Sequence, residues 1–309
     1  MESLVDQNGR RPGMGVAGGV STVPRRTLGI GLRAARDRAG VKLKDAAELL
    51  GVSEQTIWRI EQGTTSTKPP YVQALCDAYG VPDGMRDVLL GLARETRAPG
   101  WWQAYGDVLP NWFGAYVCLE QAANRIRIFD PTMMPGLLQC HDYSDVVIRI
   151  DRPDWSDDEV SRCLELKQAR QQVLTRAFPT PPSVESIISE AVLTAEPKPE
   201  GTMRRQLWHL LKATELPNVS IRILDRRIGP HLGSLAGSFK MLDFPEQNGY
   251  MPPPTVFSEN LVGAVCLDKP SEIKAYSRAW DSISRAAFSE HETIGLLREN
   301  LREWNDRER

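Results

Sequence analysis

Three polar side chains within a six-residue stretch, Glu54, Gln55 and Arg59, have the chemistry needed to read the edges of nucleic-acid bases. A glutamine amide pairs with adenine through two hydrogen bonds, a guanidinium favours guanine, and a carboxylate accepts a bond from cytosine N4. Each good contact of this kind discriminates between bases by about 1–3 kcal/mol. Trp58 lies among them, and its indole either touches a thymine methyl group or a sugar, or packs on a neighbouring helix. The sequence leaves both interpretations of Trp58 open.

Side chains that read bases need a rigid support, and the stretch 43–63 predicts two short helices, at 43–50 and 53–62, joined by a tight turn. Gly51 stands where the chain leaves the first helix and needs a left-handed residue, and Ser53 can cap the second helix. Five small or apolar residues would point into one shared core: Ala46, Leu50, Val52, Ile57 and Ile60. This is the layout of a DNA-binding helix-turn-helix, whose second helix enters the major groove. The alternative is a plain helical hairpin inside a core.

Contacts to phosphates would come from basic and hydroxyl side chains around these two helices. The predicted set is Lys42, Lys44, Ser53, Thr56, Arg25 and Arg26. Lys42 and Leu43 stand at the places where many domains of this class carry a capping threonine and a glutamine, and Lys42 would replace the lost phosphate contact. Arg25 and Arg26 form either a basic arm on phosphates or a solvated charge pair, and the sequence favours neither.

The charge of the chain is uneven along its length. The whole sequence carries a net charge of -2, with a mean hydropathy of -0.35, whereas residues 1–97 hold 14 Lys and Arg against 11 Asp and Glu. The basic excess of +3 therefore lies with the predicted helix-turn-helix, as contact with phosphates requires. We expect a disordered, glycine-rich leader at 1–23, a five-helix domain of Xre type at 24–97, and an effector or partner-binding domain at 98–309.

The second half of the sequence predicts mixed α and β structure with a helical lead-in and a small sheet. Helices are expected at 113–129, at 156–177 after a Ser156/Glu159 capping box, at 202–214 and over most of 271–304. Strands are expected at 184–188, 219–223 and 239–244, with a last strand starting at 256. The fold class is thus multi-domain, all-α followed by mixed α and β.

A ligand pocket in this second domain would be built from Glu190 and Glu259, which lie at strand ends, and His231, which lies in a loop. The alternative for His231, beside glycine and proline, is a plain turn residue. We find no catalytic constellation, no metal-ligand spacing and no cofactor motif. Five scattered cysteines without a C-x-x-C pair indicate reduced thiols in the cytoplasm, and no apolar run reaches membrane-spanning length.

From about residue 27 the chain resembles the WhiJ-like regulators of actinomycetes, which join a Xre/Cro-type helix-turn-helix to a large domain of uncharacterised role. The matching stretches are Gly100-Trp101-Trp102, Asp107-Val108-Leu109-Pro110, Pro135-Gly136-Leu137-Leu138-Gln139, Glu190-Ala191-Val192-Leu193, Glu259-Asn260-Leu261 and Leu267-Asp268-Lys269-Pro270. The resemblance implies a transcriptional regulator, in some cases antitoxin-like, often encoded beside a small BldB-like protein that would be its partner. It implies no ligand.

Three hypotheses follow. The first is a sequence-specific regulator that binds double-stranded DNA and whose second domain senses a small protein or a metabolite. It would bind as a homodimer, since two helix-turn-helix domains must reach half-sites about one helical turn apart. The second is an antitoxin-like interaction protein that mainly binds a small partner. The third, a remote one, is an enzyme with a DNA-binding head, which requires Glu190, His231 and Glu259 to converge. The expected location is the cytoplasm, at the nucleoid.

Overall fold

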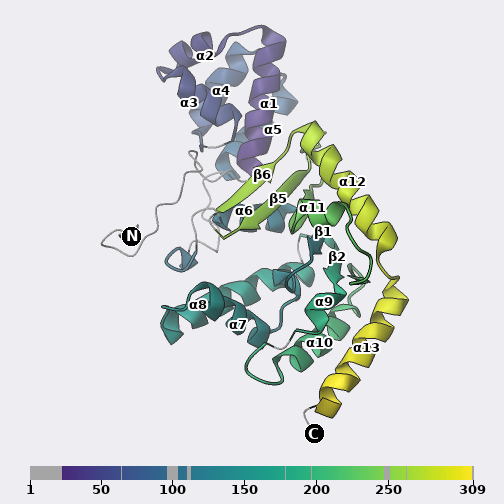
Figure 1. Cartoon of the computed structure of the whole chain (residues 1–309). Helices are drawn as coiled ribbons and strands as arrows, with labels where there is room; N and C mark the ends of the chain where they lie inside the picture. The colour runs from purple at the N-terminus through teal and green to yellow at the C-terminus, as the bar shows by residue number, and fades with distance from the viewer. Residues whose placement is uncertain are drawn as a thin grey trace, which may run out of the picture.

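Helices form the first part of the chain, and a mixed sheet covered by helices on both faces forms the rest (Figure 1). The computed structural model describes residues 23–63, 65–95, 104–109, 113–177, 179–195, 197–246, 251–261 and 263–307. All of the predicted leader except Val23 lies outside these residues.

Five helices build the N-terminal domain, close to the predicted bounds: α1 (Val23–Ala39), α2 (Leu43–Leu50), α3 (Glu54–Glu61), α4 (Pro69–Ala78) and α5 (Asp83–Glu95). All five contribute to one buried core that includes Leu32, Ala46, Ile57, Leu75 and Leu89. Leu50 and Val52, at the turn, pack against this core from its edge. The predicted helix-turn-helix geometry is therefore present.

The turn between α2 and α3 has the predicted left-handed glycine. Gly51 has φ 63° and ψ 36°, a conformation that a residue with a Cβ adopts only at a cost. The amide of Val52 then donates to the carbonyl of Ala47 at 3.0 Å, which satisfies an acceptor left open where α2 ends. The turn therefore fixes the direction in which α3 leaves.

Six strands form a single sheet within the described residues, in the order β3-β2-β1-β4-β5-β6. Their bounds are β1 (Arg125–Asp130), β2 (Ser183–Ser189), β3 (Val219–Leu224), β4 (Phe239–Asp243), β5 (Thr255–Asn260) and β6 (Gly263–Leu267). The first three are parallel, and β4 runs antiparallel to β1, β5 to β4 and β6 to β5. The predicted class of mixed α and β structure is confirmed.

Side chains alternate between the two faces of the sheet, and each face has its own core. Ile126 and Ile128 of β1 point into the larger core, whereas Phe129 points into the smaller one on the opposite face. Along β5, Phe257 and Val256 divide in the same way. Strand parity therefore determines which polar side chains lie on the same face of the sheet and can contact one another.

The helices of the second domain cover both faces of this sheet (Figure 1). Their bounds are α6 (Phe113–Ala122), α7 (His141–Asp151), α8 (Asp157–Gln171), α9 (Glu190–Leu193), α10 (Thr202–Ala213), α11 (Leu232–Ala236), α12 (Pro270–Ala286) and α13 (Glu290–Arg307). The larger core takes side chains from α6 and α10, and the smaller core takes them from α12. The predicted capping box starts α8: Ser156 Oγ accepts from the Glu159 amide, and the Glu159 carboxylate accepts from the Ser156 amide.

The prediction of one helix over 113–129 is wrong. The helix ends at Ala122, and residues from Arg125 form β1, which lies inside the sheet. Charged and apolar residues alternate from Arg125 to Ile128, which is the period of a strand, and pairing with β2 and β4 stabilises that choice. The structure also adds α7, and β6 follows the strand that we expected to be the last.

Candidate nucleic-acid interface and the polar cluster of the second domain

The second helix of the helix-turn-helix, α3, buries one side and exposes the other. Ile57 and Ile60 are buried in the core, while Glu54, Gln55, Trp58 and Arg59 are exposed. Trp58 is 49% exposed, an unusual fraction for an indole, so it is not packed into the domain. The four side chains predicted to contact bases therefore share one solvent-facing surface.

The start of α3 is held by a local cap. Ser53 Oγ accepts from the amide of Thr56 at 3.2 Å, and the two hydroxyl oxygens lie 2.9 Å apart. Both hydroxyls predicted to contact phosphates thus already serve the cap. The free amides in the first turn of a helix attract anions, so the cap and a DNA phosphate would use the same end of α3.

Lys42 and Lys44 are exposed at the start of α2, as a phosphate contact needs. Lys42 is the N-cap residue of α2, and its amide donates to the Asp45 carboxylate at 3.3 Å. Lys44 lies 3.8 Å from Glu48 in a solvent-exposed pair. Such a pair is weak, so it leaves the ammonium of Lys44 able to turn toward a phosphate.

A buried ion pair, which the sequence analysis did not identify, fixes α3 against α1. Arg36 Nε and Nη2 donate to the two Glu61 oxygens at 2.6 and 3.0 Å, and the Glu61 side chain is 4% exposed. The hydrogen bonds that Arg36 donates to Glu61 raise the pKa of Arg36, against the lowering effect of burial. Glu61 follows Ile57 and Ile60 at helical spacing on the buried side of α3, and that spacing is the signal that could have revealed it.

Arg25, predicted either to form a basic arm on phosphates or to belong to a solvated charge pair, lies on α1 and not on the two helices joined by the turn. It belongs to the first turns of α1, at the end that contacts α6 of the second domain. There its charge acts on Cys118 of α6, whose pKa is raised to about 12, chiefly by burial. Arg25 is therefore part of a helix that begins at Val23, and its contact with a phosphate stays a prediction. The side chain of Arg26 lies outside the described part of the chain.

The three residues of the predicted ligand pocket are not brought together. His231 caps α11 through a bond from the Gly233 amide to Nδ1 at 3.0 Å, and its ring centroid lies 6.0 Å from that of Phe129 in the smaller core. Glu259 lies on the opposite face of the sheet, since it has the parity of Phe257 in the larger core. Glu190, after β2, accepts from the Arg226 amide at 3.2 Å. The pocket that the enzyme hypothesis required is thus not formed by these residues.

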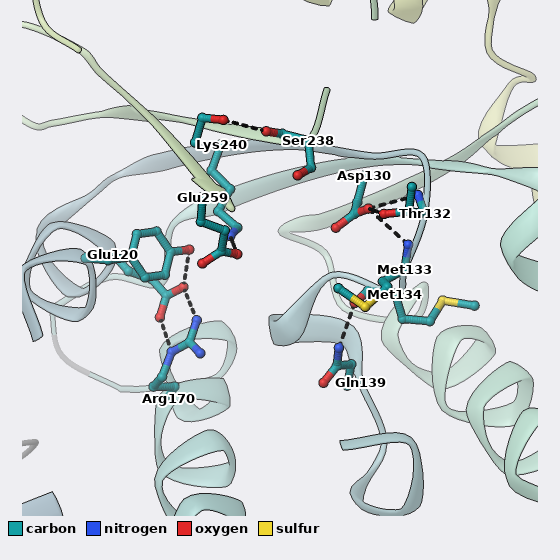
Figure 2. Close-up of polar contacts among 12 residues, drawn as sticks. Glu120, Asp130, Thr132, Met133, Met134, Gln139, Arg170, Ser238, Lys240 and Glu259 are labelled. Atoms are coloured by element: carbon teal, nitrogen blue, oxygen red, sulfur yellow. Dashed lines mark hydrogen bonds and ion pairs between the residues drawn. The ribbon is translucent and has the colours of Figure 1, made fainter. Parts of the chain in front are cut away.

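Glu259 instead joins a polar cluster beneath the sheet. Figure 2 shows Lys240 of β4 and Glu259 of β5 reaching toward Glu120 and Arg170, which come from α6 and α8. Lys240 donates to Glu259, and Arg170 donates to both Glu120 oxygens at 2.9 Å. Glu120 and Arg170 are almost fully buried. We refer to these four residues and Tyr116 as the sheet cluster.

Tyr116 lies at the centre of the sheet cluster. Its hydroxyl donates to Glu120 at 2.6 Å, and its ring lies 5.4 Å from the Arg170 guanidinium carbon and 5.0 Å from Lys240 Nζ. Burial, and then the charge of Glu120, raise the pKa of the phenol well above its usual value, so it stays protonated and donates. Two cations thus flank one aromatic ring, an arrangement that the ring's negative faces stabilise.

Lys167, one helical turn before Arg170, extends this region. Its ammonium donates to the Gln139 amide oxygen at 2.8 Å. Gln139 in turn donates to the Met134 carbonyl at 2.8 Å (Figure 2). Burial, with the charge of Arg170 next, lowers the pKa of Lys167 to about 8. Lys167, Arg170 and Lys240 thus share this region with Glu120 and Glu259, and the charge of Asp151 also acts on Lys167.

The described ranges hold no group of three His, Cys, Asp or Glu side chains placed to bind a metal ion together. Within the same ranges, no helix combines the length and the hydropathy needed to cross a bilayer.

Two family models match the chain. Residues 27–89 match the model of a helix-turn-helix domain, so the first part of the protein is a DNA-binding domain of that class. None of the curated proteins and none of the solved structures matches the chain. Residues 113–299, more than half of the sequence, match a family model described as "Domain of unknown function (DUF5753)", and the protein therefore belongs to the DUF5753 family.

Proposed function

We propose that the protein is a sequence-specific transcriptional regulator that reads DNA with α3 and receives a signal through its DUF5753 domain. The observation that carries the proposal is the exposure of Glu54, Gln55, Trp58 and Arg59 on one side of a helix whose other side is anchored in the domain core. Exposed polar side chains on a rigid second helix are what the major groove requires. The WhiJ-like regulators remain the class that the sequence resembles.

The signal in this proposal is a small partner protein or a metabolite bound by the second domain, which binds and does not catalyse. A partner would be encoded nearby and BldB-like, as the resemblance implies. The protein acts as a homodimer in the cytoplasm, at the nucleoid, because two heads double the contacts to a palindromic operator. An antitoxin-like role would use the same binding event, but the binding of the partner, and not a change in DNA affinity, would then be the main activity.

Helix α6 supports a physical route from the second domain to the head. It carries Tyr116 and Glu120 of the sheet cluster, and it contacts α1, where the charge of Arg25 acts on Cys118. A ligand that separates Glu120 from Arg170 would change where α6 sits, and α1 would follow. Such a ligand changes the affinity for DNA only to the extent that it binds more tightly to one position of α6 and α1 than to the other.

The test is a fluorescence anisotropy titration of the full-length protein on a duplex from its own upstream region, across a salt series. The change is Gln55→Ala with Arg59→Ala, which removes two base contacts and leaves the core intact. Two contacts of about 1–3 kcal/mol each predict a loss of specific affinity of at least thirtyfold. Arg59 also carries charge, so the salt slope should fall by about one unit.

The matched control removes the same residue types elsewhere in the domain, through Gln73→Ala on α4 with Arg33→Ala on α1. This control should bind the upstream duplex within about threefold of the wild type, since it removes charge but no base contact. Equal losses in both double variants would mean that the binding is electrostatic only and that α3 does not read bases. Sedimentation of the protein free and on the duplex tests the dimer, and a monomer in both states would exclude it.

A further inference from the structure

A groove of about 630 Å³ lies between the start of α7, the middle of α10 and the end of α13. Its lining combines one large aromatic side chain with basic and polar ones: Cys140, His141, Asp142, Arg204, Arg205, Trp208, His209, Leu301 and Asn305. Figure 1 shows these three helices at the end of the molecule away from α1–α5. A partner bound there would leave α3 able to reach DNA.

Trp208 is the apolar anchor of this groove. Its side chain is 56% exposed, although its helix buries Leu207 and Leu210 on the other side. Tryptophan and arginine are the residue types most enriched among the few that dominate binding energy at protein interfaces. An exposed indole in a concave lining, flanked by two arginines, has the composition of such an interface centre.

The charge of the groove selects the partner. The lining holds two guanidinium groups and one carboxylate, and that carboxylate, Asp142, is already ion-paired with Arg205. The Arg205 side chain is still 43% exposed, so its guanidinium can meet a second acceptor. Lys212 lies 5.7 Å from the Trp208 ring centroid, but its ammonium is paired with Glu215 at 3.1 Å and adds no net charge. Burial lowers the pKa of His209, which keeps that imidazole neutral, so the basic character comes from the longer side chains.

We propose that this groove binds an acidic segment of a partner polypeptide, with an apolar side chain of the segment packed on Trp208 and a carboxylate on Arg205. The inference rests on the partner-binding role proposed for the second domain. It specifies which surface of that domain binds the partner and which chemical groups the partner presents. An extended open groove suits a peptide better than a small molecule, because a small ligand is usually enclosed over most of its surface. Charge complementarity then excludes basic segments.

The experiment selects binders from a random dodecapeptide display library on the immobilised full-length protein. The enriched peptides should carry net negative charge and at least one aromatic or large aliphatic residue. Their affinities, measured by anisotropy, should fall at least tenfold in Trp208→Ala and at least tenfold in Arg205→Glu. The matched control is Trp58→Ala, which removes the other half-exposed indole in the helix-turn-helix domain and should leave peptide affinity within twofold.

Four results would overturn the proposal. The first is a selection that enriches neutral or basic peptides or none, and the second is acidic peptides that bind Trp208→Ala as well as wild type. The third is release of the peptides by saturating duplex DNA, which would place them on the basic head. A Trp208→Ala variant that dissociates a homodimer would identify the occupant as a second copy and equally exclude this partner. Circular dichroism of both groove variants checks that they fold, and their unchanged DNA binding separates failure here from failure of the regulator proposal.

Discussion

Deleting the carboxylate of Glu61 should loosen the helix-turn-helix domain far more than its single ion pair would suggest. The Glu61 side chain is buried and that of Arg36 is 12% exposed. Breaking a buried pair by removing one partner costs about 3–5 kcal/mol, because the other charge stays in a poorly polarisable site. In Glu61→Leu, Arg36 keeps its bond to the Val41 carbonyl at 3.0 Å and its contact with Asp37 at 3.0 Å. The cost of this variant should therefore lie at the lower end, at about 3 kcal/mol.

The reverse deletion should cost more, and the double variant much less. Arg36→Met leaves a buried carboxylate without its guanidinium, so its cost should lie near 5 kcal/mol. Replacing both partners, in Arg36→Met with Glu61→Leu, leaves two apolar side chains in contact and should cost only about 1 kcal/mol. That strong non-additivity is what coupling through a buried pair means. The exposed Glu48→Leu change, beside Lys44, is the control and should stay within about 0.5 kcal/mol.

Hydrogen exchange of the intact chain, read by mass spectrometry on peptides from α1–α5, measures this without separating the domains. A loss of 3 kcal/mol in the opening free energy speeds exchange of the most protected amides by roughly 150-fold, since each 1.4 kcal/mol is tenfold. Peptides from the sheet should be unchanged. If the two single variants alter protection less than fivefold, or if the double variant shows the sum of their effects, then the pair does not hold α3 against α1.

Other predictions test packing, capping and protonation. A Cβ on Gly29 would lie 2.5 Å from the Glu61 carbonyl oxygen, so Gly29→Ala should destabilise the domain by about 1–3 kcal/mol in urea titrations and weaken DNA binding. The control is Gly84→Ala, whose added Cβ meets no atom within 4 Å and should change neither property. Ser53→Ala removes the cap of α3 and should cost about 1 kcal/mol by the same titration. The pKa of Lys167 is lowered from 10.5 to about 8 in the folded chain, so between these pH values the unfolded chain binds more protons than the folded one. The urea midpoint of unfolding should therefore rise as the pH increases from about 8 to 10.5. Lys167→Met should lose the part of this rise that comes from the ammonium group.

The helix-turn-helix could be predicted because its signals are local. Gly51 and Ser53 are adjacent to the turn that they shape, and the apolar spacing of Ile57 and Ile60 repeats within one helix. Every interaction that defines the motif spans fewer than about twenty residues, so periodicity and capping rules suffice. Arg36 and Glu61 lie 25 positions apart, and only the buried position of Glu61 on its helix hints at a partner.

The second domain resisted prediction where distant pairing decides the structure. The sequence predicts a helix at β1 because Ile126 continues an apolar helical spacing. The strands that pair with β1, β2 and β4, come from about 60 and 115 residues further along the chain. The predicted pocket was wrong for a related reason. The sequence shows that Glu259 lies near a strand end, but the face of the sheet to which it points depends on strand parity. The orientation of the His231 ring depends on the hydrogen bond by which it caps α11.

The sheet cluster has a composition that stability alone does not explain. A buried pair such as Glu120 and Arg170 can often be replaced by apolar side chains without loss of stability, whereas a pair that lacks one partner is costly. Such a pair therefore makes the position of its two helices sensitive to any ligand that competes for either charge. Because α6 brings Glu120 to α8 and also contacts α1 of the helix-turn-helix domain, such a ligand would act on a helix that packs against both domains.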